Sequence, residues 1–304
     1  MEIRIIGRGA LAGFIAGVFG FVFARIFAEP LVGKAIAYEE GRSEILDKLN
    51  AAIGRATEPE GPEIFSRTIQ SNIGLASAII GFATAMGAIC AVAYLLLHGR
   101  FKIQPQTLGW MVAAFGFLGV YLLPFVKYPT NPPAVGHDFT IATRGRLYLT
   151  MVLASIVLLG LAVLATRKLL PRFGLYRSIL IAAFGFFVLY GLLIGLLPSL
   201  GHLAANKDHA NQFGFARSAT ETPQPIVNVT DQTLTVDGTA FGPGQLVYPG
   251  FDPDLLWKFR WYSLINQLIV WTGIGLIFGG LLNRFFGIAS REQAEPAREP
   301  VAVA

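Results

Sequence analysis

The sequence predicts an all-α integral membrane protein, a bundle of about six transmembrane helices with two long loops on the outer side. Hydrophobic residues make up 54% of the 304 residues and charged residues only 14%, whereas a typical soluble domain is about 25% charged. The mean hydropathy is +0.56. The apolar residues fall in runs of roughly 17–25, the length that crosses a bilayer as a helix. Membrane lipid is therefore an expected partner.

Six apolar runs are candidate spans: about 9–28, 73–97, 108–126, 147–166, 178–197 and 261–282. We treat residues 1–289 as one membrane domain and 290–304 as a charged, disordered tail. The net charge of +5 fits basic cytoplasmic loops better than a nucleic-acid surface, so no nucleic-acid partner is expected.

The first run has two interpretations. Its charged start and apolar middle also suit a cleaved signal peptide, but bulky Ile26 disfavours a small-residue cleavage site. We favour a retained helix in which Arg25 extends its head group towards water. Gly9, Gly13 and Gly17 recur every four residues, a pattern that lets helix backbones approach closely.

The first long loop, 29–72, is polar and rich in acidic residues. Apolar residues recur at helical spacing over 35–53, which predicts an amphipathic helix that Pro59 and Pro62 bring to an end. Most of the acidic residues are expected to form a solvated face.

The chain has an unusual corner at residues 127–136, which read Lys-Tyr-Pro-Thr-Asn-Pro-Pro-Ala-Val-Gly. Proline fixes φ and lacks an N–H, so the corner must be a stiff, mostly extended turn. One interpretation is a tight connector that stops two helices. The other is a fixed platform at the membrane surface that orders the helices around a pathway.

The second long loop, 198–260, contains His202, Asp208 and His209. Within it, residues 226–241 alternate apolar and polar side chains and include Asp237-Gly238. This pattern predicts a β-hairpin.

Lysine and arginine residues set the predicted orientation. With six spans and both termini cytoplasmic, the inside loops 98–107 and 167–177 hold two and four of these cations. Lys127 and Arg144 then lie outside, against the rule. We expect them to pair with Glu29 or Glu39, since a poorly solvated charge needs a partner.

Separated sequence blocks resemble the CbtA family of predicted cobalt transporter subunits. The blocks, which together span most of 8–285, are Ala12-Gly13 to Phe23-Ala24-Arg25, Glu29-Pro30, Ala35-Ile36, Tyr38-Glu39, Lys127-Tyr128-Pro129, Asn131-Pro132-Pro133, Ala134-Val135-Gly136, Arg144, Pro253-Asp254-Leu255-Leu256, Phe259-Arg260, Gln267 and Trp271.

The resemblance implies cobalt uptake linked to cobalamin synthesis, in a bacterial inner membrane. It also implies a small partner, CbtB, with one span and a His-rich end. The family is described with five spans, whereas we count six. Residues 226–241 do not resemble the family and are interpreted as a local insertion.

The sequence has few side chains of the types that bind metal ions, so we expect only a weak metal site. Cobalt(II) suits imidazole and carboxylate ligands, and no span has an Asp, Glu or His at its centre. The candidate ligands all lie outside in the predicted topology: Glu29, Glu39, His137, His202, Asp208 and His209. The other charges near the outer ends are structural or pathway candidates: Arg25, Arg67, Lys127, Arg144 and Arg260.

Two functions from different classes remain. The first is a membrane subunit for divalent-metal uptake, with the first metal contact in an outer vestibule and with the Gly9, Gly13 and Gly17 face packing a partner helix. The second is a scaffold that assembles another subunit and passes no solute. Cobalt(II) enters the first as cargo, and no resident cofactor is expected. An enzyme is not expected, because the chain has no P-loop, no H-E-x-x-H sequence and no evident nucleophile–base pair.

Overall fold

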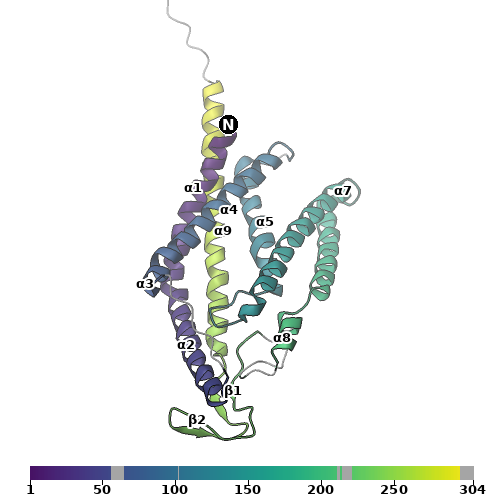
Figure 1. The fold of residues 1–304 in the computed structure, drawn as a ribbon. Helices are drawn as coiled ribbons and strands as arrows, with labels where there is room; N and C mark the ends of the chain where they lie inside the picture. Colours follow the sequence, from purple (N-terminus) through teal and green to yellow (C-terminus); the bar gives the residue numbers. More distant parts are fainter. Residues whose placement is uncertain (56–64, 102, 211–212, 214–220, 295–304) are drawn as a thin grey trace, which may run out of the picture. The chain divides into compact units, whose positions relative to one another are not determined.

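The computed structural model describes residues 1–55, 65–101, 103–210, 213 and 221–294, and long helices dominate it (Figure 1). Five helical stretches in these residues are long and apolar enough to cross a membrane: Glu2–Ala52, Arg67–Leu97, Pro105–Lys127, Asp138–Asp208 and Pro253–Gly287. The predicted helical membrane-protein class is therefore confirmed.

The structure has five such stretches rather than six because the predicted fourth and fifth spans share one element, α7 (Ile141–Leu196). The link between them is helical except at Gly174, whose φ of 72° and ψ of 172° reverse the chain. The two arms, 141–173 and 175–196, lie side by side (Figure 1). Met151 and Tyr190 join them in one buried cluster with Tyr128.

The first stretch is continuous where a loop was expected. α1 (Glu2–Phe23) runs through a π-helical turn, η1 (Ala24–Ala28), directly into α2 (Glu29–Ala52). The amphipathic helix predicted for 35–53 is confirmed, although it begins earlier. It ends at Ala52, and Gly54 follows with φ of 72°. Pro59 and Pro62, which were expected to end it, lie outside the described residues.

Two further stretches contain π-helical turns. The second stretch consists of α3 (Arg67–Ile69), η2 (Gln70–Gly74) and α4 (Leu75–Leu97). The third consists of α5 (Pro105–Gly116), η3 (Phe117–Leu122) and α6 (Leu123–Lys127). Such turns widen a helix locally and often occur at functional sites.

The chain divides into two compact units, and the first comprises Met1–Val22, Asn72–Phe117 and Asn266–Ala304. Its helices approach closely at small residues. A side chain at Gly9 or Gly13 of α1 would meet the backbone of Gly87 or Ala83 in α4. α4 of the same chain thus occupies the glycine face that was expected to receive a partner helix.

The second unit comprises Phe23–Ser71 and Leu118–Ile265, and it contains the predicted β-hairpin. β2 (Leu234–Val236) pairs antiparallel with β3 (Thr239–Phe241). Asp237 and Gly238 form the turn with positive φ values of 49° and 76°, as two-residue hairpin turns require. The hairpin prediction is confirmed. Its expected start at Ile226 belongs instead to β1 (Ile226–Val227), which pairs with β4 (Leu246–Tyr248).

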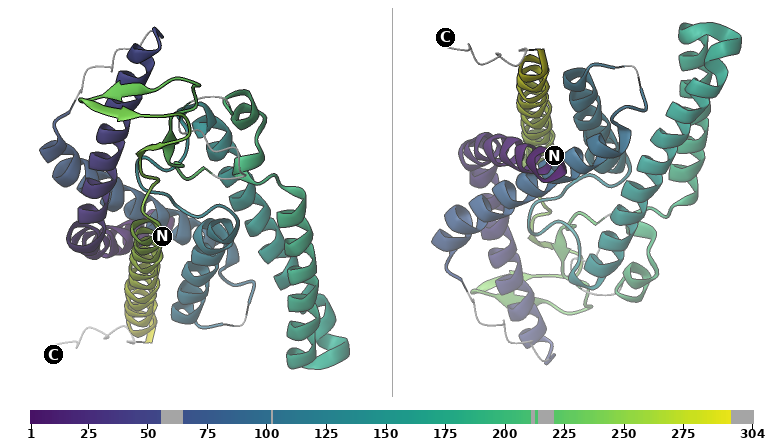
Figure 2. Two further views of the ribbon diagram at one scale, coloured as in Figure 1. Left: turned by 90° about the horizontal axis from the view of Figure 1, so that it is seen from below. Right: turned by 90° about the horizontal axis from the view of Figure 1, so that it is seen from above.

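The hairpin is fixed to α2. Leu234 and Val236 share a buried cluster with Leu49, and Lys48 forms an ion pair of 2.6 Å with Asp237. Figure 2 shows the strands beside α2 in both views. The strands of the second long loop are thus packed on α2.

The remaining short helices border the corner and the second long loop. They are η4 (Asp138–Thr140), η5 (Leu200–His202) and α8 (Ala204–Asp208). The last helix, α9 (Pro253–Ala294), includes the predicted sixth span. Because α9 continues to Ala294, residues 290–294 are helical rather than part of a disordered tail, and residues 295–304 lie outside the described part of the chain.

Candidate functional site

The start of the proline corner is bound to the end of α7. Lys127 Nζ donates a hydrogen bond of 2.8 Å to the carbonyl of Ile194, and the hydroxyl of Tyr128 donates one of 2.8 Å to the carbonyl of Pro198. The Tyr128 ring is buried. These contacts connect two helix ends that are far apart in the sequence.

The middle of the corner is bound to α9 and α2. The Asn131 side-chain oxygen accepts a hydrogen bond of 2.8 Å from Arg260 Nη2. Val135 packs in a buried cluster with Ala35 of α2 and Phe251 beside α9. The corner therefore contacts elements from three distant parts of the chain.

The end of the corner requires glycine. Gly136 has a φ of 107°, a conformation that side chains other than hydrogen disfavour. A side chain there would also overlap the guanidinium of Arg144. That guanidinium donates long hydrogen bonds of 3.4 Å to the Val135 carbonyl and 3.3 Å to the His137 carbonyl. Arg144 thus holds the backbone on both sides of Gly136.

A buried carboxylate, Glu221, is the centre of this site, and only 6% of its surface is exposed. Its carboxylate accepts hydrogen bonds from the His137 amide (3.1 Å), the Thr140 hydroxyl (2.9 Å) and the Asn206 side-chain amide (3.0 Å). Its backbone carbonyl accepts one of 2.9 Å from the Gly136 amide. Glu221 therefore connects its own segment of the second long loop to α8 and to the end of the corner.

The electrostatic environment favours a neutral His137. Burial of the imidazole lowers the pKa of His137, and the nearby positive charges of Arg42 and Arg144 and the His209 ring lower it further. The Glu221 carboxylate opposes these effects. A neutral imidazole is the form that binds a metal ion.

Two histidines stack on one aromatic ring. The Phe139 ring stacks on His137 at a centroid distance of 5.0 Å and on His209 at 3.8 Å. The Ala205 carbonyl lies 2.8 Å from His209 Nδ1. Because a carbonyl only accepts, Nδ1 carries the proton, and in the neutral ring Nε2 carries the lone pair.

The other predicted ligands are more dispersed. His202 is exposed and bonds to the Ser199 hydroxyl at 2.7 Å. Asp208 is exposed at the end of α8, and Glu39 on α2 is within electrostatic reach of Asp138. Among the described residues, no three His, Cys, Asp or Glu side chains are grouped closely enough to hold a metal ion.

The expected pairing of Lys127 and Arg144 with Glu29 and Glu39 is wrong, since no ion pair in the described residues joins them. Both cations instead donate to backbone carbonyls of the corner and of α7. Glu29 is buried and pairs with Arg67, the first residue of α3. Close carbonyls thus replace the carboxylates that the sequence suggested.

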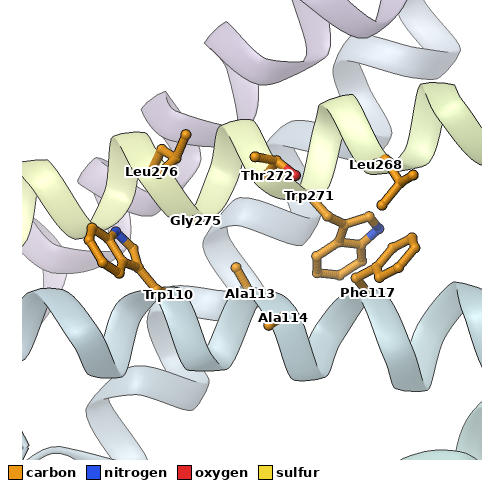
Figure 3. Close-up of a pocket in the computed structure, with 9 residues that line it drawn as sticks. All are labelled: Trp110, Ala113, Ala114, Phe117, Leu268, Trp271, Thr272, Gly275 and Leu276. Atoms are coloured by element: carbon orange, nitrogen blue, oxygen red, sulfur yellow. The ribbon is translucent and has the colours of Figure 1, made fainter.

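The first unit contains a pocket of about 300 Å³ between α5 and α9. Figure 3 shows Trp110 and Phe117 on one side and Leu268 and Trp271 on the other. The Trp271 indole N–H is already satisfied by the Gln267 side-chain oxygen at 3.1 Å. This lining is mostly apolar and has no carboxylate or imidazole, the ligands that suit cobalt(II).

Sequence reasoning missed Glu221 and Asn206. Asn206 lies in the five-residue helix α8 and Glu221 outside any helix or strand, so neither belongs to a periodic pattern long enough to mark an inward-facing position. Phe139 was also missed, because a single aromatic residue near a helix start is not distinctive. Of the predicted metal ligands, the structure brings His137 and His209 near each other, both stacked on the Phe139 ring.

Residues 2–283 match the family model described as probable cobalt transporter subunit (CbtA). The match extends from α1 into α9 and includes the corner, Glu221 and all four strands. No curated protein and no solved structure matches the chain.

Proposed function

Because the chain belongs to the CbtA family of probable cobalt transporter subunits, we propose that it is the membrane subunit of a cobalt uptake system. In this proposal, the ion makes its first contact beside the proline corner. The family match carries the assignment to transport. The position of the contact is supported by the His137–Phe139–His209 stack.

The proposed topology has six crossings in a bacterial inner membrane, with both termini cytoplasmic. The support comes from α7, whose 56 residues far exceed the 20 or so that one crossing needs. Its reversal at Gly174 divides it into two arms, each with an apolar run of spanning length. With a cytoplasmic N-terminus, six crossings would leave the corner and both long loops on the outer side.

The proposed contact uses imidazole nitrogens, which suit cobalt(II). His137 and His209 each offer one imidazole contact, and burial lowers the pKa of His137, which favours its neutral form. Exposed Asp208, His202 and Glu39 add weak attraction at the surface. Glu29 is the least available of the predicted ligands, because Arg67 already neutralises it.

A contact with so few ligands binds weakly, which suits capture followed by release. The missing ligands would come from a small His-rich subunit with one span, the partner implied by the family resemblance. That subunit would have to use a surface other than the Gly9–Gly13 face, which α4 fills.

Cobalt uptake at limiting metal tests this proposal. Cells that express the chain together with its partner are compared with cells carrying the double variant His137→Ala/His209→Ala. The matched control is His98→Ala, which replaces the one histidine that is not a predicted ligand. We expect reduced uptake only in the double variant, at equal protein levels. Unchanged uptake in the double variant would remove these histidines from the mechanism.

A membrane scaffold is the second candidate. It is favoured by the close glycine contact between α1 and α4 and by the apolar lining of the pocket in Figure 3. Purified chain in liposomes, with and without the partner, discriminates the two. A scaffold leaves cobalt flux through the partner's own pathway intact when the histidines are replaced, whereas a permease subunit does not.

A further inference from the structure

The turn between the two arms of α7, residues 167–177, is strongly basic. Four cations lie in these eleven residues, and all four side chains are exposed: Arg167, Lys168, Arg172 and Arg177. The sequence contains no Asp or Glu from 139 to 207, so no acidic residue of the same hairpin neutralises them. Figure 1 shows this basic turn at the end of the hairpin furthest from α8.

The basic turn also presents large apolar side chains. Tyr176 is 76% exposed and Leu175 is 62% exposed. Phe173 lies beneath the Arg172 guanidinium, whose central carbon is 5.3 Å from the ring centroid. A turn that exposes both cations and aromatic rings matches the boundary between lipid headgroups and acyl chains, where tyrosine is enriched.

The backbone holds this surface in place. Gly174 supplies the left-handed conformation that reverses the chain, and the Ser178 hydroxyl donates a hydrogen bond of 2.7 Å to the Gly174 carbonyl. Both arms continue as helices directly from the turn. The four cations are therefore displayed by an ordered hairpin rather than by a loose loop.

We propose that the basic turn is a binding site for anionic phospholipid headgroups. Arginine binds phosphate oxygens through two parallel N–H donors, and basic clusters at the ends of membrane helices bind anionic lipids. The exposed Tyr176 and Leu175 side chains enter the acyl region beside the same headgroup. This site is separate from the corner and does not depend on which ion the chain transports.

Native mass spectrometry of the full chain in detergent tests the proposal. The chain is offered equal amounts of phosphatidylglycerol and phosphatidylcholine, which differ in headgroup charge. The wild type should retain phosphatidylglycerol preferentially. Replacing Arg167, Lys168, Arg172 and Arg177 with Gln should lower that preference by roughly tenfold or more, since each cation contributes to headgroup attraction.

A matched control removes the same charge elsewhere, through Gln at the exposed cations Lys34, Arg55, Lys207 and Lys258. It should keep the wild-type preference. Should the first variant fail to fold, replacing the three turn arginines with Lys keeps the charge and should keep most of the preference. Equal preference in the Gln variant and the control, or a wild-type preference that persists at about 1 M salt, would overturn the proposal.

Discussion

Replacement of Glu221 by Ala should release the end of the proline corner. The carboxylate accepts three hydrogen bonds, from the His137 amide, the Thr140 hydroxyl and the Asn206 amide. A hydrogen bond to a charged group contributes about 1.5–3 kcal/mol. Thr140 and Asn206 have second acceptors, the carbonyls of His137 and Leu200.

The free energy of local opening is therefore expected to fall by about 3–4 kcal/mol, which is less than the loss of three complete hydrogen bonds to a charged group. Hydrogen exchange of the full chain in detergent measures it directly, because local opening exposes the amides of residues 136–145. At about 1.4 kcal/mol per tenfold change, exchange there should accelerate by roughly two orders of magnitude. This local measurement avoids assuming two-state unfolding, which large membrane proteins do not follow.

Two variants make the test specific. Glu221→Gln keeps the shape, and its amide can donate to the buried Asn206 side-chain oxygen, which lacks a hydrogen-bond partner among the described residues. It should cost clearly less than Ala. Asp231→Ala removes an exposed acid from the same loop and should change nothing at the corner. Unchanged exchange of residues 136–145 in Glu221→Ala would refute the role assigned to Glu221.

Three further outcomes follow from the same contacts. Arg67→Ala should destabilise the chain by about 2 kcal/mol in thermal unfolding by stranding buried Glu29, and adding Glu29→Gln should recover part of the loss; equal losses would contradict the pairing. Gly13→Leu should abolish the monodisperse elution of the purified chain, because Gly13 touches the α4 backbone, whereas Gly7→Leu, in open space, should not. The pKa of His137 is lowered in the folded chain, so the imidazole binds a proton more readily in the unfolded chain. Stability should therefore fall as the pH drops below about 6.5 and stay flat above it. His137→Gln should make the stability less dependent on pH below about 6.5.

The sequence was informative wherever a pattern repeats. Apolar runs predicted the long helices, helical spacing predicted α2, and Asp237-Gly238 predicted the hairpin turn. Each pattern reflects a local property, either a helix face or a turn conformation, which residues close in the chain determine. The errors concern whether a helix continues or ends, which local patterns do not determine.

Helix continuity was the main error. The polar residues after 28 indicated a loop, yet η1 carries the helix directly from α1 into α2. Likewise the basic residues 167–177 indicated a connector, yet they are helical on both sides of Gly174. Polar side chains do not break a helix when they are good helix formers, and only Gly174 has the conformation that reverses the chain.

The partners of buried charges were equally hard to predict. Sequence reasoning assigned carboxylates to Lys127 and Arg144, because opposite charges are the obvious partners. The structure gives them backbone carbonyls at the ends of a helix and a turn. Such acceptors exist in every sequence, so no residue type marks them, and only the fold brings them into reach.

The two interpretations of the corner can now be weighed on physical grounds. A connector between two helices needs contacts only with those helices. This corner bonds to Ile194 and Pro198 at the end of α7, to Arg260 in α9 and to Glu221 in the second long loop. Losing a contact of a simple connector would affect only the two helices that it joins, whereas loosening this corner disturbs three segments at once. The distribution of contacts therefore favours a fixed platform, and His137, the central imidazole of the proposed metal contact, follows it directly with its amide bound to Glu221 and its carbonyl bound to Arg144.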